Sequence, residues 1–332
     1  MTHRIPYPLL LIGLVLLAIA FGILSMLVGP GGGPTEISAM IARGDTDLAW
    51  MIVGEVRLPR TFLALMVGAT LGLAGAALQG YLRNPLADPG VVGVSSAASL
   101  GAVLALYTGV SLAFPMALPL MGIAGAVLCA LLLQGLAGRG AVLTLVLAGV
   151  AISSLCAALM SLALNFSPNP YAAAEIMFWL MGSVTDRSMD HVALAAPLMM
   201  IGWAMLLLVA RSLDALSLGE EAAASLGVHT GRTRALVIGG TAISVGAATA
   251  ISGGIGFIGL VVPHLLRHQV GHSPSKLLLA SALGGATLLM AADVLVRVLP
   301  TGMELKLGVV TALVGAPFFL WLIFRARTEF ES

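Results

Sequence analysis

The sequence predicts an all-α polytopic membrane protein, and its composition and its long apolar runs are the reasons. Of the 332 residues, 59% are hydrophobic and only 9% are charged, and the mean hydropathy is +1.05. Soluble domains carry roughly 25% charged residues, so this chain cannot cover a globular surface with charge. Several apolar runs reach the length of about 20 residues that a helix needs to cross the hydrocarbon core. We therefore expect residues 1–332 to form a single transmembrane domain.

The membrane spans can be placed from the apolar runs in chain order. The first run, Leu9–Val28, is assigned to a transmembrane helix because it exceeds the apolar segment of about 7–15 residues in a signal peptide. The next expected spans are Arg60–Gly80, Val91–Tyr107, Met116–Leu136, Ala141–Leu164, Val192–Val209, Ala235–Ile251, Leu277–Val298 and Leu307–Phe324. A shorter run, Ile255–Leu266, gives a tenth element. Ala172–Met181 is expected to be a short extra helix at the membrane interface, since it carries Phe178 and Trp179.

Glycine recurs within these spans where it would let helices approach one another. The second span contains Gly68, Gly72, Gly75 and Gly80. Close approach of helices in lipid needs small side chains, because no hydrophobic force drives their association there. We therefore expect this span to pack tightly against its neighbours. Later in the chain, the glycine-rich run 253–256 predicts an interrupted helix, which membranes tolerate only where protein or water surrounds the backbone.

The distribution of basic residues predicts the orientation of the chain. If the N-terminus is cytoplasmic and ten elements cross the membrane, the C-terminus is cytoplasmic as well. Ten lysines and arginines then fall on the cytoplasmic side and six on the outer side. This excess agrees with the rule that cytoplasmic loops carry more positive charge.

One stretch, Arg211–Arg234, is dense in charge and interrupts the apolar runs. Its leucines and alanines recur every three to four residues, and Gly219 and Gly227 stand where short helices would end. We interpret it as two short amphipathic helices that lie outside the bilayer, on the cytoplasmic side, and offer a surface to a partner. From these residues alone the alternative stays open, that the stretch is a loop that only joins two spans.

Three arginines fall on the outer side, against the charge bias. Arg57 and Arg60 lie one helical turn apart at the start of the second span, and Arg297 follows Asp293 by four residues at the end of a later span. Such arginines could form a docking surface for an acidic partner through charge-assisted hydrogen bonds. The alternative is that they extend to the interface while their aliphatic stems stay in the membrane.

The sequence also lacks the signatures of several functions. A nucleotide-binding loop ends in Gly-Lys-Ser/Thr, and neither Lys276 nor Lys306 follows a glycine. The spans lack the chain of acidic residues that proton-coupled transporters tend to carry, so energy for transport would have to come from another polypeptide. Cys129 and Cys156 lie in apolar runs. We predict no catalytic residues, no metal site, no cofactor and no nucleic-acid partner.

Three segments resemble a known family. Gly54–Ala102, with the motif RNPLADPG, Gly253–Arg267, with GFIGLVVPH, and Glu304–Ile323 are similar to permease subunits of ABC importers for iron-siderophores, haem and cobalamin. The resemblance implies a cobalamin-permease-like fold, that of type II ABC importers, with about ten transmembrane helices per subunit. It also implies a permease domain over residues 1–332, with a cytoplasmic coupling segment at 212–230.

The resemblance implies partners and a cargo as well. Such permeases act as a pair of permease subunits, here expected to be a homodimer, with two ATP-binding cassette subunits and a periplasmic substrate-binding protein. The complex would lie among the lipids of the bacterial inner membrane and import an iron chelate, either a siderophore or haem. Cobalamin is the alternative within the family. A secondary transporter that works alone is the alternative from another class, and an integral-membrane enzyme would need a cluster of acids or histidines that the sequence does not show.

Site residues follow from the same resemblance. Arg57, Arg60 and Arg297 match arginines that meet glutamates of the binding protein. Asn84 and Leu86 match the cytoplasmic gate, and Val142 and Leu143 stand where cobalamin permeases carry small polar gate residues. The fifth and tenth helices would line the pathway at the subunit interface. The residues matching the surface that couples to the ATPase are Leu216, Ser217, Leu218, Gly219, Glu220, Glu221, Ala222, Ala223, Leu226 and Gly227.

Overall fold

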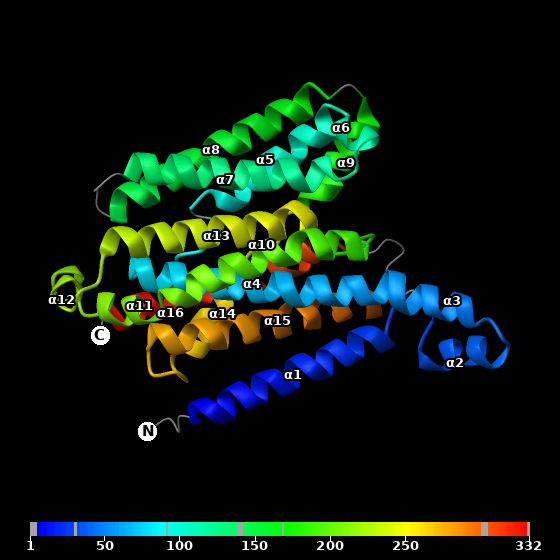
Figure 1. The fold of residues 1–332 in the computed structure, drawn as a ribbon, viewed down its shortest axis with the longest axis horizontal. Coiled ribbons are helices and arrows are strands. Elements are labelled where there is room, and N and C mark those ends of the chain that lie inside the picture. The colour runs from blue at the N-terminus through cyan, green and yellow to red at the C-terminus, as the bar shows by residue number, and fades with distance from the viewer. Residues whose placement is uncertain are drawn as a thin grey trace.

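The computed structural model describes residues 5–29, 32–90, 92–137, 142–167, 169–299 and 305–330. Within these ranges the regular secondary structure is helical throughout. The long helices run in roughly one direction, as Figure 1 shows. Helices α11 and α12 lie at one end of this bundle, together with the beginning of α1, and α2, α3, α6 and α9 lie at the opposite end (Figure 1).

Ten apolar helices correspond one by one to the ten expected elements. They are α1 (Tyr7–Leu27), α4 (Leu58–Leu82), α5 (Val94–Tyr107), α7 (Ala117–Ala137), α8 (Val142–Asn165), α10 (Met189–Leu208), α13 (Thr230–Ser252), α14 (Ile258–Arg267), α15 (Pro274–Val298) and α16 (Leu307–Phe330). Seven helices of the described chain are long and apolar enough to cross a membrane, and α5, α14 and α16 are the shorter apolar ones. The predicted all-helical membrane fold is confirmed.

Shorter helices connect the spans. They are α2 (Pro34–Ala42), α3 (Thr46–Trp50), the π-helical turn Met51–Arg57, α6 (Val110–Ala113), α9 (Pro170–Leu180), α11 (Ala210–Leu216) and α12 (Glu220–Ser225). Helix α9 is the extra helix that the sequence predicts. The second span differs from its expected bounds, because the helix continues without a break from Thr46 to Leu82.

Helix α4 lies at the centre of the bundle and packs against its neighbours through glycines (Figure 1). A Cβ atom on Gly72 would lie 2.0 Å from the carbonyl oxygen of Ser281 in α15. A Cβ atom on Gly75 would lie 2.0 Å from the carbonyl oxygen of Gly259 in α14. The backbones of α4, α14 and α15 are therefore in direct contact, which only glycine at these positions of α4 permits.

The peripheral helices expose apolar side chains instead. In the most apolar 18-residue stretch of α1, only 11% is buried against the rest of the chain. In the corresponding stretch of α8, 17% is buried. Leucines and isoleucines on α1, such as Leu16 and Ile19, face outward. Exposed apolar helices of this length are stable against lipid or against another apolar subunit, and not against water. The chain is a multi-pass membrane protein.

The break between α13 and α14 is the interruption that the glycine-rich run predicts. Gly253 ends α13 with a φ of +69°, and a Cβ atom there would lie 2.2 Å from the carbonyl oxygen of Trp179. Phe257 precedes α14 with a φ of +67°, a left-handed conformation that is unfavourable for a bulky residue. The break turns α14 so that it lies between α4, α15 and α16.

Candidate functional site

The predicted coupling segment, residues 212–230, covers most of α11 and all of α12, at one end of the bundle (Figure 1). Gly219 separates α11 from α12 with a φ of +112°, and Gly227 follows α12 with a φ of +82°. Nothing lies within 4 Å of a Cβ atom built on either glycine, so the backbone conformation, and not space, favours glycine at both positions. The predicted pair of short helices is confirmed.

The two helices of the coupling segment differ in how they are held. Leu213 and Leu216 of α11 are buried, and Leu213 packs against α4 at Gly80. On α12 and its flanks, the acidic pair Glu220 and Glu221 is exposed. Leu218 and Leu226 are 69% and 65% exposed. Helix α11 is thus part of the bundle, whereas α12 presents leucines and acids outward.

The remaining residues predicted to face the ATPase fall into three groups by exposure. Ser217 and Gly227 are exposed, and Gly219 and Ala222 are half-buried. Leu216 and Ala223 are buried, at 3% and 0% exposure. These two side chains can support the segment from beneath but do not reach its outer surface.

Asp214 fastens the coupling segment to α15, a role that the sequence analysis did not assign. Its carboxylate accepts a hydrogen bond from the backbone N–H of Ser275 at 2.9 Å and one from the Ser273 hydroxyl at 3.5 Å. Helix α15 begins at Pro274, so the carboxylate lies at its first turn, where backbone N–H groups lack partners within the helix. The sequence shows that Asp214 lies in a charge-dense stretch, but it does not show that its carboxylate binds the first turn of α15.

Replacing Asp214 with alanine is expected to lower stability by about 1 kcal/mol, the usual cost of losing a helix N-terminal cap. The segment 212–230 should also be cleaved faster by protease, since α11 loses its bond to α15. Thermal unfolding and limited proteolysis of the purified protein measure the two effects. Asp214→Asn keeps an acceptor oxygen and should lie between the alanine variant and the wild type. Equal protease sensitivity of all three proteins would contradict the anchoring role.

Of the predicted gate residues, Asn84 and Leu86 lie in the loop that follows α4, and Val142 and Leu143 lie at the start of α8. Asn84 is exposed, and its side-chain oxygen accepts a hydrogen bond from the backbone N–H of Leu86 at 2.9 Å. Leu143, at the start of α8, is 66% exposed. Val142 begins α8, and its side chain lies outside the described part of the structure. The loop meets α8 through Ser153, whose hydroxyl donates to the Gly90 carbonyl at 3.2 Å. The gating role of these residues stays a prediction.

The three arginines predicted for the outer side form a buried cluster with Asp293, which we call the arginine cluster. Arg60 Nη2 lies 2.9 Å from Asp293 Oδ1, and Arg297 pairs with the other oxygen of the same carboxylate. Arg57 is 1% exposed, Arg60 4%, and the side chain of Arg297 1%. A carboxylate between two guanidinium groups offsets part of the cost of burying them.

The arginine cluster also binds the carbonyl groups at the end of α1. Arg57 Nη1 donates to the Met26 carbonyl at 2.9 Å, and Arg297 Nη1 donates to the carbonyls of Ser25 at 2.8 Å and Val28 at 3.0 Å. The last carbonyls of a helix lack partners within it, and positive charge is favourable there. The cluster therefore attaches the end of α1 to α4 and α15.

This burial bears on the predicted docking role. A partner could not reach the three guanidinium groups directly in this conformation, because each is covered and bound within the chain. The alternative, that the arginines extend their charged ends to the membrane interface, does not describe them either, since these ends are enclosed. The docking role stays a prediction that would require the cluster to open.

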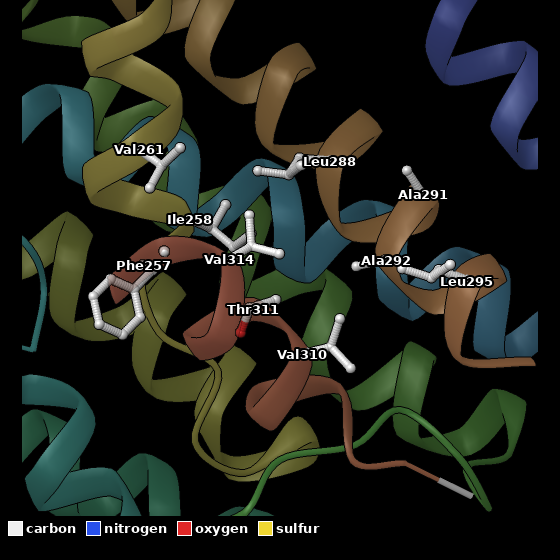
Figure 2. A pocket seen from close by; sticks show the side chains of 11 residues that line it. Phe257, Ile258, Val261, Leu288, Ala291, Ala292, Leu295, Val310, Thr311 and Val314 are labelled. Carbon is white, nitrogen blue, oxygen red and sulfur yellow. The ribbon is translucent and has the colours of Figure 1, made fainter. Parts of the chain in front are cut away.

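An apolar cavity of about 190 Å³ lies between α14, α15 and α16. Figure 2 shows side chains from the three helices around it, among them Phe257, Leu288 and Val314. Thr311 supplies the one side-chain hydroxyl in the described lining, and that hydroxyl donates to the Gly308 carbonyl at 3.0 Å. These walls offer no charge for a polar or ionic cargo.

Comparison with known proteins identifies the family. The profile of the FecCD transport family matches residues 14–325. The chain belongs to the FecCD transport family. Its relatives include the hemin transport system permease protein HmuU of Yersinia pestis, 39% identical over 294 residues, which cover 85% of this chain and 86% of that protein. The FecCD family is a permease family of ABC importers, and the resemblance seen in the sequence is confirmed.

Two further FecCD relatives and a solved structure are similar over most of the chain. The Fe(3+) dicitrate transport system permease protein FecD of Escherichia coli is 43% identical over 280 residues, covering 84% of this chain and 86% of that protein. The cobalamin import system permease protein BtuC of Halobacterium salinarum is 41% identical over 295 residues, covering 86% and 77%. A solved structure described as an inward-facing conformation of a metal-chelate type ABC transporter has a TM-score of 0.84 and 34% identity, covering 96% and 99%.

Proposed function

We propose that this chain is the permease subunit of an ATP-driven importer that carries an iron chelate, a siderophore or haem, across the bacterial inner membrane. The family match over residues 14–325 is the observation that carries the proposal. The names of HmuU and FecD refer to hemin and Fe(3+) dicitrate, and the similar solved structure is of the metal-chelate type. The name of BtuC refers to cobalamin, which is therefore the second candidate cargo.

The energy source is a separate ATPase that binds the coupling segment. Helix α12 and its flanks protrude from the bundle and present Leu218, Leu226, Glu220 and Glu221, a mixture of apolar and acidic side chains that suits a protein partner. The sequence contains no Gly-Lys-Ser/Thr loop, so ATP is hydrolysed elsewhere. The coupling segment and the beginning of α1 lie at the same end of the bundle in Figure 1, which supports cytoplasmic termini.

A second copy of the chain completes the pathway. Helix α8 exposes Leu155 at 61%, and α16 exposes Leu313 at 70%, so both carry apolar faces that the chain itself leaves open. In the proposed homodimer these faces meet across the pathway.

A periplasmic binding protein delivers the cargo at the end of the bundle opposite the coupling segment, near the arginine cluster. Charge reversal of Arg57 and Arg60 would also break the attachment of α1, so loss of docking in that variant needs a check of folding.

Replacing Glu220 and Glu221 together with alanine is expected to reduce co-purification of the ATPase roughly tenfold. A few residues carry most of the binding energy of an interface, and a joint loss of about 1.4 kcal/mol at this acidic pair weakens binding tenfold. The measurement is the ratio of ATPase to permease after affinity purification of the complex. A double variant of Glu55 and Glu175, two exposed acids outside the coupling segment, is the matched control and should retain the ATPase. Full retention by the Glu220 and Glu221 variant would show that the coupling surface is assigned wrongly.

A further inference from the structure

Helix α14 contains a carbonyl group that its own backbone cannot satisfy. Pro263 lies inside α14, and proline has no N–H group. The carbonyl that this missing N–H would bind belongs to Gly259, four residues earlier. Gly259 is also the place where the backbone of α14 touches α4 at Gly75, so water cannot easily take the place of the missing donor. A buried carbonyl without a donor would be costly.

Gln79 of α4 supplies the donor and joins a second element. Its side-chain Nε2 donates to the Gly259 carbonyl at 3.2 Å and to the Ala87 carbonyl at 3.3 Å. Ala87 belongs to the predicted gate loop, and Gln79 is 1% exposed. One buried amide group therefore holds the gate loop and the broken helix α14 together.

Arg267 fixes the orientation of this amide. Its Nη2 donates to the side-chain oxygen of Gln79. An amide that accepts from an arginine on one side must direct its NH₂ group to the other side, toward the two carbonyls. Arg267 lies at the end of α14, so α14 both receives a hydrogen bond from Gln79 and orients the donor.

The other end of the gate loop is bound to α8. A Cβ atom on Gly259 would lie 3.0 Å from Asp88 Oδ2 and 3.1 Å from Pro89 Cδ, so the loop lies directly on α14. Ser153 of α8 donates to the Gly90 carbonyl at 3.2 Å. The loop is thus tied to α4 and α14 through Gln79 and to α8 through Ser153.

We propose that Gln79 and Arg267 are positioning residues of the cytoplasmic gate, which hold the loop 84–90 against α14 so that movement of α14 or α8 is transmitted to it. The gate role in this inference rests on the proposed permease function, whereas the contacts of Gln79 do not. In physical terms, the buried amide keeps the loop packed against α14. This packing can be measured on the permease without any transport.

The test is the reactivity of a cysteine placed in the loop. Ala87 is 3% exposed, so Ala87→Cys should react slowly with a membrane-impermeant maleimide added to vesicles that expose the coupling end. Gln79→Met keeps the length of the side chain but removes both donated hydrogen bonds. We expect it to raise the labelling rate roughly tenfold, as loss of buried hydrogen bonds increases local opening. Arg267→Met should give a smaller rise, because the amide remains but can turn away.

Three controls separate positioning from general loosening. The native Cys129 and Cys156 are buried at 1% and 5% exposure, and their labelling should not change in Gln79→Met. Gln269→Met makes the same substitution at a glutamine outside the gate, and should leave labelling of the loop at the wild-type rate. Pro263→Ala restores an N–H group for the Gly259 carbonyl. Added to Gln79→Met, it should recover thermal stability while the loop stays reactive.

The outcomes are distinct. Selective labelling of the loop in Gln79→Met, with or without Pro263→Ala, supports the proposal. Wild-type labelling in Gln79→Met would overturn it, and so would a parallel rise at Cys129 and Cys156, or a return to slow labelling when Pro263→Ala is added. If no ATPase co-purifies with the chain, the proposed function fails, while the labelling result still decides whether Gln79 holds the loop.

Discussion

Asp293→Ala is expected to destabilise the folded protein by about 3–5 kcal/mol, because two buried guanidinium groups would lose the carboxylate that they share. Arg60 and the side chain of Arg297 have almost no exposure to solvent, so water cannot replace the lost charge. Helix α1 should loosen as well, because Arg297 also holds the last carbonyls of that helix. Thermal unfolding of the purified protein, followed by its intrinsic fluorescence, measures the change.

A carboxylate on the surface provides the control for this prediction. Glu220 lies 3.6 Å from Arg83, and the two side chains are 59% and 46% exposed. Exposed pairs of this kind contribute about 0–1 kcal/mol, so Glu220→Ala should leave the unfolding temperature nearly unchanged. If Asp293→Ala unfolded at the wild-type temperature, the arginine cluster would not be a stabilising element of the fold.

Gly72→Val is expected to destabilise the bundle by about 3 kcal/mol or more, at the upper end of what overpacking a core costs. A Cβ atom at this position would lie 2.0 Å from the Ser281 carbonyl oxygen, so α4 and α15 would have to move apart. No rotamer relieves this clash, because the obstacle is backbone. The yield of monodisperse protein and its unfolding temperature should both fall.

Gly22→Val is the matched control, since Gly22 is also a glycine of an apolar membrane helix. Nothing lies within 4 Å of a Cβ atom built on Gly22, so the added side chain extends into open space. We expect wild-type yield and stability for this variant. Equal behaviour of the two variants would mean that α4 and α15 do not pack through their glycines.

The spans could be predicted because they depend on local composition. Each apolar run of sufficient length became a helix, and the glycine-rich run 253–256 became the break between α13 and α14. The coupling segment was recognisable because its charges and its two glycines interrupt the apolar pattern. The glycines of α4 predicted close packing, and Gly68, Gly72 and Gly75 contact other backbones, whereas Gly80 meets side chains at ordinary distances.

The arginine cluster shows where sequence reasoning was insufficient. The sequence places Arg57, Arg60, Asp293 and Arg297 at the ends of their spans, but their burial depends on where α1 ends relative to α4 and α15. That arrangement is a property of the assembled bundle, and no local pattern encodes it. The local sequence around an arginine is the same whether its side chain binds a partner protein or the end of a helix in its own chain.

The role of Gln79 was missed for a similar reason. An isolated glutamine in a span of small and apolar residues was a signal that something must satisfy its amide. Pro263 was the second signal, because it leaves one carbonyl without a donor. Only the structure shows that these two features, far apart in the chain, meet at Gly259.

The importer assignment itself can be tested by one measurement, the ATPase activity of this chain purified with its ATP-binding subunit in lipid. The activity is compared with and without a binding protein loaded with an iron chelate, with haem or with cobalamin. We predict co-purification of the ATPase and stimulation by a binding protein loaded with an iron chelate or haem, which would also identify the cargo. If no ATPase co-purifies and the chain alone transports a substrate, the importer assignment is contradicted and a secondary transporter takes its place.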